Sequence, residues 1–581
     1  MSLQLTSPGT RARLLPLRGT MRLNRPGDIW YKPAFSAATA MAAGNGGLLA
    51  AGRPDLALYA SAGALCALYG HALPYAARAR ALAVLVLGMA AGVGVALTAA
   101  SLTGSAAVLV LVAALLAGAQ RALCDASRIG PPGNIVLTFV TAGACFAPQR
   151  LGQVPLHLGL VLACGAFAWL VCMAPALVRP YGPERVVAAR ALEATARLLR
   201  ADGAAEGDGV PRARHAATAA LHTARRGLAH TRTGGHPLAG LEALLLRAES
   251  ATAREGADGP AAARRHESWA RDLRAGRPLP DGLRPTAGSD GSVPAGGVPA
   301  AEPARTAAPR GSSRAAHAPG AGGTGSAPAA PDARPARRWF RSPSAPVAVR
   351  VTAGAAAAGW AASALGAGHP YWAVVTAAAV FQANTALSWQ RALQRVLGNL
   401  LGLLLFALLP PAVRTGHPAM VLLVVVLLIG AEASIVRNYW LASVCVTPMA
   451  LLLTEFGGAR PARELIGDRW TDTLIGAAVG LLVCVLVTNR RATDRTDAAL
   501  GRLSEARAAA LALLDAPHSA HEAGRARDRL ATALVELREA ADVAAGEWWQ
   551  RTLPAERVRL AERDGHRALA ALVHRLAPAA A

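Results

Sequence analysis

Long apolar blocks alternate with short polar connections in two parts of the chain. The first part holds blocks at about 34–51, 56–73, 81–101, 105–120, 134–148 and 155–178. The second part holds blocks at about 346–366, 371–388, 393–411, 418–434, 437–455 and 469–488. A helix needs roughly 20 mostly apolar residues to cross about 30 Å of hydrocarbon. The pattern therefore predicts an all-α polytopic membrane protein with two sets of about six transmembrane helices.

Each set of blocks is followed by a charged segment rich in alanine and leucine, for example RVVAARALEATARLLRA and RDRLATALVELREAADVA. Apolar residues recur there at helical spacing, which favours amphipathic helices outside the membrane. We predict an N-terminal cytoplasmic segment (1–33), a first transmembrane repeat (34–178), a cytoplasmic helical segment (179–275), a disordered linker (276–344), a second transmembrane repeat (345–489) and a C-terminal cytoplasmic helical segment (490–581).

The linker prediction rests on composition. Pro, Ala, Gly and Ser dominate residues 276–344, and such a segment cannot bury enough apolar surface to offset the entropy of ordering it.

The two sets of blocks share landmarks at matching places. Arg53-Pro54 matches His369-Pro370, Arg78 and Arg80 match Arg391 and Arg395, and Gly88 and Gly92 match Gly398 and Gly402. Glycines four residues apart allow helices to approach closely, so these four are candidates for helix packing. An even number of spans in each copy leaves both copies in the same orientation, which predicts parallel repeats.

Arginines gather in alternate connections of both sets. Connections on the cytoplasmic side of a membrane carry an excess of arginine and lysine. The arginines that define this side are Arg78, Arg80, Arg121, Arg128, Arg179, Arg185, Arg190, Arg391, Arg395, Arg437, Arg490, Arg491 and Arg495. We therefore expect a multi-pass protein of the cytoplasmic membrane with both termini in the cytoplasm. One connection disagrees, because Arg460, Arg463 and Arg469 fall on the expected outer side.

Composition excludes several classes of function. The formal net charge is +24, but the arginine distribution explains it without nucleic acid, and no nucleic-acid-binding motif is present. Lys32 is the only lysine, so a Walker A loop, which needs a lysine, is excluded. The seven cysteines lack CxxC spacing, and no catalytic motif stands out. We expect neither enzyme activity nor a metal or other cofactor.

The stretch from His369 to Leu409 resembles the fusaric acid resistance protein-like family, which includes exporters of aromatic carboxylic acids. The resemblance rests on HPYWAVVTAAAVFQ, on RALQRVLGNLLG and on the plan of six spans followed by a helical segment. The matching span of the first half, LALYASAGALCALYGHAL, lacks the Trp and Gln of the later copy. The resemblance implies efflux of small, often aromatic, organic anions, coupled to the proton gradient.

Arg391 and Arg395 are candidates for binding the carboxylate of a substrate. They lie four residues apart on one helix face, and the guanidinium fork matches carboxylate oxygens. Anchoring at the cytoplasmic surface is the alternative, and the sequence alone favours it. Asn399 lies between Gly398 and Gly402, where an amide is expected to bridge helices more than to contact a substrate.

Three residues stand at the predicted outer entrance of the block 371–388. Trp372 and Tyr371 are expected to belong to the aromatic belt of the membrane interface, with stacking on an aromatic substrate as the alternative. His369 is a candidate for proton coupling because an imidazole titrates near neutral pH.

Polar side chains deeper in the second set of blocks need partners. Gln382 and Asn384 fall in the lower half of the block 371–388, where their amides would bind another helix or a substrate. Glu432 is expected to pair with Arg437 at a loop edge, or to carry protons if it lies within the membrane. Asp472 is a second proton-coupling candidate, since ionisable groups inside a membrane are costly and often functional.

The sequence thus favours a secondary transporter that exports small aromatic or other organic acids by alternating access of two parallel halves. A passive organic-anion channel is one alternative, because plant malate channels share a broadly similar plan. A non-transporting membrane scaffold is another. The expected partners are the lipid bilayer and a small organic anion, and a homo-oligomer is left open.

Overall fold

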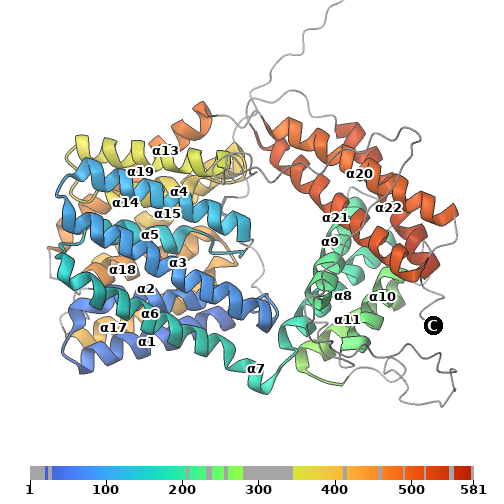
Figure 1. Ribbon diagram of the computed structural model, residues 1–581, viewed down its shortest axis with the longest axis horizontal. Coiled ribbons are helices and arrows are strands. Elements are labelled where there is room, and N and C mark those ends of the chain that lie inside the picture. Colours follow the sequence, from blue (N-terminus) through green and yellow to red (C-terminus); the bar gives the residue numbers. More distant parts are fainter. Residues whose placement is uncertain are drawn as a thin grey trace, which may run out of the picture.

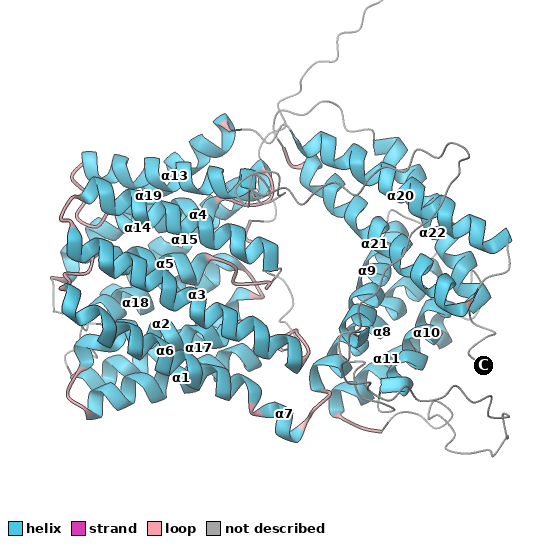
Figure 2. Cartoon of the chain, in the orientation of Figure 1, coloured by secondary structure: helices cyan, strands magenta, loops and turns pink. Residues whose placement is uncertain are grey.

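A computed structural model gives the arrangement of the chain. It describes residues 20–23, 29–127, 129–203, 209–229, 238–253, 259–278, 345–409, 415–455, 461–487, 491–515, 519–547 and 555–576. Within these ranges every element is helical (Figure 2). Most of the predicted linker and of the predicted N-terminal segment lies outside the described residues.

The apolar helices of both parts of the chain form one bundle (Figure 1). The first half contributes α1 (Tyr31–Ala50), η1 (Pro54–Leu56), α2 (Ala57–Ala64), η2 (Leu65–Leu68), α3 (Tyr75–Leu102), α4 (Ala106–Ser127), α5 (Ile135–Cys145), η3 (Leu151–Gln153), α6 (Val154–Met173) and α7 (Pro175–Val178). The second half contributes α13 (Ala345–Ala364), α14 (Tyr371–Val380), α15 (Thr385–Ala407), α17 (His417–Ile435), α18 (Tyr439–Glu455) and α19 (Ala462–Leu486). By length and composition, five helical stretches of the described chain are suited to crossing a membrane. The all-α polytopic membrane fold is therefore confirmed.

Corresponding helices of the two halves make corresponding contacts. Helix α13 packs on α4, and α1 packs on α17, so each half places its first helix against the fourth of the other. Within each half the second helix packs on the sixth, α2 on α6 and α14 on α19. A duplicated unit would give this pattern, although the duplication itself stays a prediction.

Two predicted boundaries are wrong by several residues. The block 371–388 is not one helix, because α14 ends at Val380 and α15 begins at Thr385. Asn384 is extended (φ −145°, ψ 170°) and its side chain accepts a hydrogen bond from the backbone N–H of Leu387 at 2.9 Å. It therefore caps the N-terminus of α15 rather than lying in a span. The last span begins at Ala462, earlier than the predicted 469.

The charged helices form a second body beside the bundle, which we call the helical domain (Figure 1). Its helices are α8 (Gly182–Gly203), α9 (Gly209–Ala229), α10 (Ala239–Ala253), α11 (Gly259–Ala275), α20 (Arg491–Asp515), α21 (Ala520–Ala545) and α22 (Ala555–Leu576). Helices α8 to α11 share one apolar core, and α20 to α22 share another.

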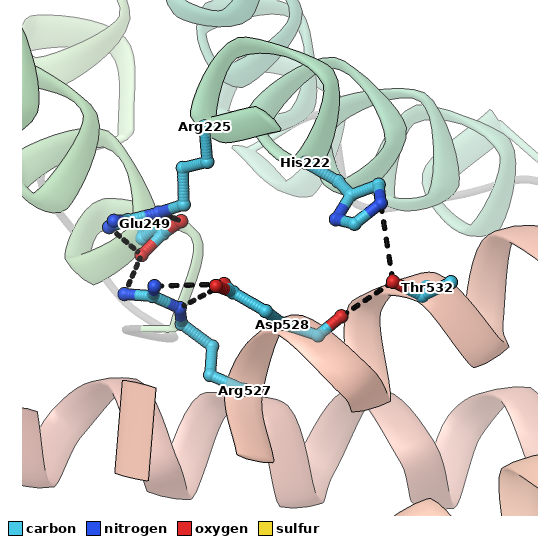
Figure 3. Close-up of polar contacts among 6 residues, drawn as sticks. All are labelled: His222, Arg225, Glu249, Arg527, Asp528 and Thr532. Atoms are coloured by element: carbon cyan, nitrogen blue, oxygen red, sulfur yellow. Dashed lines mark hydrogen bonds and ion pairs between the residues drawn. The ribbon is translucent and has the colours of Figure 1, made fainter. Parts of the chain in front are cut away.

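An ion cluster joins these two groups of helices (Figure 3). The carboxylate of Glu249 lies between Arg225, which binds it through two nitrogens, and Arg527 of α21, whose Nη1 is 3.6 Å away. Nearby, Nε2 of His222 lies 3.3 Å from the hydroxyl of Thr532. The helical segments that follow the two sets of spans therefore meet as one domain.

The helical domain also contacts the bundle at the start of α15. The hydroxyl of Thr385 donates to Glu547 at 2.7 Å, and the backbone N–H of Ala386 donates to the carbonyl of Gly546 at 3.0 Å. The side-chain amide of Asn384 donates to the carbonyl of Asp542 at 3.3 Å. This end of the bundle is called the domain side below, and the opposite end the distal side.

Candidate functional site

A cavity of about 1350 Å³ opens between the two halves on the domain side. We call it the domain-side cavity. Both halves line it, and one wall residue, Arg190, comes from the helical domain. Its polar lining includes Arg121, Asp125, Gln382, Gln390, Arg391, Glu432 and Tyr439. The sequence-predicted residues Arg391, Gln382 and Glu432 are thus brought to one space.

Two of the arginines that line this cavity, Arg121 and Arg391, differ in their partners. Arg121 binds Asp125 at 2.9 Å and donates from Nη1 to the carbonyl of Phe381 at 3.3 Å. The guanidinium of Arg391 lies 3.9 Å from the centre of the Tyr439 ring, and no carboxylate of the described chain pairs with it. Arg391 therefore supplies positive charge to the cavity that a bound anion could neutralise.

The other polar candidates around the cavity are partly used by the protein. Gln382 lines the cavity and donates from its side chain to the carbonyls of Ala379 and Phe381, both at 3.1 Å. Glu432 forms no ion pair with Arg437 within the described residues, contrary to the favoured expectation from sequence. Asn384 belongs to the turn between α14 and α15, so its predicted position inside a span is wrong.

A stretch of the N-terminal segment crosses the domain side of α15 and α18. Gln394 and Asn438 both donate to the carbonyl of Thr20, at 3.0 and 2.9 Å, and Asn438 also donates to that of Arg22 at 3.0 Å. These buried amides are occupied by backbone, so they are not free for a ligand in this arrangement.

A second cavity, of about 620 Å³, opens on the distal side. Its lining includes Arg53, Asp55, Tyr59, His157, His369, Tyr371 and Leu465. Arg53 and Asp55 neutralise each other through two contacts of 3.0 and 2.8 Å. Nδ1 of His369 lies 2.8 Å from a carboxylate oxygen of Asp468. We call this space the distal cavity.

Aromatic and charged side chains fill the wall between the two cavities. Trp372 and Arg469 are each 2% exposed. The guanidinium carbon of Arg469 lies 3.7 Å from the centre of the Trp372 ring, which also stacks on Phe139 at 5.5 Å. Arg395, 4% exposed, donates to the hydroxyl of Tyr439 at 2.8 Å. A line of arginines thus leads from the domain-side cavity into this wall.

Asp472 is the most enclosed ionisable group of the wall. It is 0% exposed, and neither of its carboxylate oxygens has a hydrogen-bond partner. Arg469, three residues earlier on α19, likewise leaves Nε and Nη1 without a partner. Buried polar groups are nearly always paired, so four unpaired atoms within one helical turn single out this part of the wall.

Asn399 and the neighbouring glycines hold the second half together. The Asn399 amide donates to Thr473 at 2.8 Å, and its oxygen accepts from Thr447 at 2.7 Å. A methyl group on Gly398 would lie 2.4 Å from the Cβ of Ser443, and one on Gly402 would lie 2.7 Å from that of Thr447. The geometry matches the helix-bridging interpretation of these residues.

The two glycines of the first half, Gly88 and Gly92, do not both pack tightly as Gly398 and Gly402 of the second half do. Gly92 is buried, and a methyl group there would lie 2.9 Å from Cγ2 of Thr141 on α5 and 3.1 Å from Nε2 of Gln120 on α4. Gly88 has only an ordinary contact, with Leu123 Cδ2 at 3.7 Å from such a methyl group. The expectation of a tight helix contact at both positions therefore disagrees with the structure at Gly88, and at Gly92 the close neighbours are side chains of the same half. Neither glycine lines one of the two cavities.

Two expectations about the wall residues are wrong. Trp372 and Tyr371 are 2% and 6% exposed, so they pack inside the bundle and not in a belt facing the membrane interface. Arg469 was expected in an outer connection, but it lies in the second turn of α19 and is buried. Sequence reasoning missed it as a site residue. The sequence did contain a signal for it, because an arginine on the predicted outer side disagrees with the charge pattern of the other connections.

Comparison with known proteins identifies part of this bundle. Residues 356–483 match the family model described as fusaric acid resistance protein-like. The chain is also 31% identical over 188 residues to a Bacillus subtilis (strain 168) protein described as uncharacterized membrane protein YvaC. That match covers 32% of this chain and 29% of the relative. No solved structure matches. The matched residues 356–483 include Trp372, Arg391 and Arg469, so this part of the bundle is similar to the fusaric acid resistance protein-like family.

Proposed function

We propose that this protein is a secondary transporter that exports small aromatic or other organic acids across the cytoplasmic membrane. The observation that carries the proposal is Arg391, a cation without a carboxylate partner in the described chain, at the surface of a cavity between the two halves. Guanidinium groups bind carboxylates with matched geometry and charge-assisted hydrogen bonds.

Alternating access is supported by the two cavities and the wall between them. The domain-side and distal cavities open at opposite ends of the bundle. Along α14, the buried Trp372 lies between Tyr371, which lines the distal cavity, and Ala378, which lines the domain-side cavity, and the guanidinium of Arg469 covers its ring. A passive channel needs a continuous water-filled path in its conducting state, so a closed wall between two vestibules favours a transporter in which the halves rock about a central site.

The helical domain faces the cytoplasm in this proposal, as the distribution of arginines predicts. The domain-side cavity is then the loading site. A membrane potential that is negative inside favours the exit of an anion by about 2.3 kcal/mol per elementary charge per 100 mV. The proton gradient can therefore drive export partly through its electrical component.

Three protonatable groups lie along the proposed path and are candidates for coupling to protons. Glu432 lines the domain-side cavity, Asp472 lies in the wall, and His369 lines the distal cavity beside Asp468. Such a series could pass protons in the direction opposite to the substrate.

Efflux from proteoliposomes tests the proposal. Purified protein is reconstituted with a membrane potential and a proton gradient, and the loss of labelled benzoate and of a panel of other organic acids is followed. We expect faster loss than from protein-free liposomes, with collapse of both gradients by an ionophore slowing it. Unchanged retention over the whole panel would refute the transporter. Steady anion currents independent of any proton gradient would favour the channel.

A further inference from the structure

We infer that Arg469 is the central carboxylate-binding residue of the wall, that Trp372 supports it, and that Asp472 is a countercharge opposing the bound anion. The inference rests on the proposed function and assigns the place where the substrate passes from one cavity to the other. The unpaired atoms of Arg469 and Asp472 carry it.

The depth of Arg469 follows from the geometry of α19. Leu465 lines the distal cavity, and each residue of an α-helix adds about 1.5 Å along its axis. Arg469 is therefore about 6 Å deeper than Leu465, and Asp472 about 10 Å deeper. Tyr371, the neighbour of Trp372, lines the same cavity. The pair of Arg469 and Trp372 thus lies deeper in the bundle than the residues that line the distal cavity.

The approach from the other side is also cationic. Arg391 lines the domain-side cavity, and Arg395 lies one helical turn further along α15. Tyr439 connects them, since Arg391 lies over its ring and Arg395 binds its hydroxyl. An anion that leaves Arg391 meets Arg395 and then Arg469. Successive cations of this kind lower the cost of moving a carboxylate through an apolar wall.

The environment of Arg469 fits a small carboxylate with an apolar body. Its guanidinium is held over Trp372 at 3.7 Å, which restricts the directions in which Nε and Nη1 point. These two donors point to different edges of the guanidinium, and each offers one charge-assisted hydrogen bond to a carboxylate oxygen. Phe139 and Tyr371, which line the distal cavity, offer aromatic surface to the rest of the molecule.

Asp472 sets the strength of this binding. It lies three residues after Arg469 on α19, so both side chains emerge on the same side of the helix. Its negative charge repels an arriving carboxylate, and burial makes this repulsion stronger than in water. Removal of the charge should therefore strengthen binding, whereas removal of the Arg469 charge should weaken it. A structural role alone would not produce effects of opposite sign.

Binding of labelled benzoate to the full-length protein in detergent tests the inference. We expect Arg469→Gln to weaken binding about tenfold or more, and Asp472→Asn to tighten it about threefold or more. Trp372→Leu should weaken binding by a smaller factor, because it removes the support of the guanidinium but leaves its charge. Benzyl alcohol, which lacks the carboxylate, should not compete with benzoate.

Arg437→Gln is the matched control, because Arg437 is exposed at the turn between α17 and α18. It should bind benzoate as the wild type does. Size-exclusion chromatography shows whether each variant is folded. If Arg469→Gln aggregates, the benzoate affinity of Asp472→Asn tests the inference by itself. A misfolded protein cannot bind benzoate more tightly than the wild type.

Two failures can be told apart. If the wild type neither binds nor transports any acid of the panel, the proposed function falls and the inference with it. If the wild type does transport benzoate while folded Arg469→Gln binds it equally well, or Asp472→Asn binds no more tightly than the wild type, the inference alone is overturned.

Discussion

The two halves of the bundle place arginines at matching positions but use them differently. Arg78, near the start of α3, is 3% exposed, and its guanidinium donates to the carbonyls of Gly70, His71 and Leu73 at 3.0, 2.7 and 3.2 Å. Arg391, near the start of α15, makes no such set of bonds within the described chain and lines the domain-side cavity. The same residue type therefore secures a turn in one half and offers charge to a cavity in the other.

The wall residues repeat this contrast. In the first half the ring of Tyr59 stacks on His157 with centres 3.9 Å apart. In the second half Trp372 stacks with the guanidinium of Arg469. Nδ1 of His157 also contacts the amide of Gln149 at 2.9 Å, so this nitrogen has a partner inside its own half. Of these two pairs, only the pair in the second half carries a permanent positive charge and unpaired donors.

Replacement of Arg78 should have the largest effect on stability. Arg78→Gln removes the charged bonds that hold the turn between η2 and α3, and it leaves buried carbonyls without donors. We expect the free energy of unfolding to fall by about 3 kcal/mol or more. Thermal unfolding in detergent and the yield of monodisperse protein measure it. Arg80→Gln is the control, because Arg80 is exposed. Equal stability of the two variants would remove the structural role assigned to Arg78.

The paired glycines should also respond unequally to alanine. In Gly398→Ala the new methyl group would lie 2.4 Å from Ser443 Cβ and 2.6 Å from the carbonyl of Trp440, so we expect a loss of about 1–3 kcal/mol. In Gly88→Ala the nearest atom is Leu123 Cδ2 at 3.7 Å, an ordinary contact. Here the better helix propensity of alanine should leave stability equal or raised by about 0.5–1 kcal/mol.

Gly92→Ala should fall between these two variants. Its new methyl group would meet the side chains of Thr141 and Gln120 at 2.9 and 3.1 Å, and no backbone atom is among its nearest neighbours. Side chains can shift more easily than a backbone carbonyl, so we expect a loss of about 1 kcal/mol. Thermal unfolding of the three variants side by side checks this order. A loss for Gly88→Ala as large as that for Gly398→Ala would mean that the halves do not differ at this position.

The hydrophobic pattern predicts the membrane bundle well because burial in lipid demands long apolar runs, and such runs are visible in any sequence. It does not predict where α14 ends. The apolar run extends one residue past Val380, and besides the cap at Asn384 the turn is held by contacts from distant parts of the chain. Arg121 of the first half donates to the carbonyl of Phe381, and Asn384 reaches Asp542 of the helical domain. A local pattern carries no information about either partner.

The site was predictable in part for a similar reason. Arg391 and Asp472 stand out as charges next to or within apolar blocks, so the sequence marks them. Arg469 precedes the apolar run and reads as a loop residue, because other charged residues lie within the first turns of α19. Its burial depends on the packing of α19 against α14, which brings Trp372 over it. Only tertiary structure supplies that contact.

Replacement of Arg391 should affect transport more than stability. Arg391→Gln keeps a polar side chain of moderate length but removes the charge at the cavity surface. We expect the initial rate of benzoate efflux from proteoliposomes to fall about tenfold, with thermal unfolding unchanged within about 0.5 kcal/mol. Arg437→Gln serves as the control for loss of an arginine on the same half. A drop in stability like that of Arg78→Gln would show that the two arginines share one structural role.

The smallest effect should come from His157, and it tests whether the halves contribute equally to the path. His157→Gln keeps a hydrogen-bonding group beside Gln149 but removes the ring stacked on Tyr59. If the second half alone carries the central anion site, the efflux rate should change by less than about threefold, because the substrate carboxylate gains no charged contact there. Measured at one substrate concentration beside Arg469→Gln, the two variants should differ by about tenfold or more. Equal losses would place a substrate contact in each half, since the stacked pair of the first half would then matter as much as the arginine of the second.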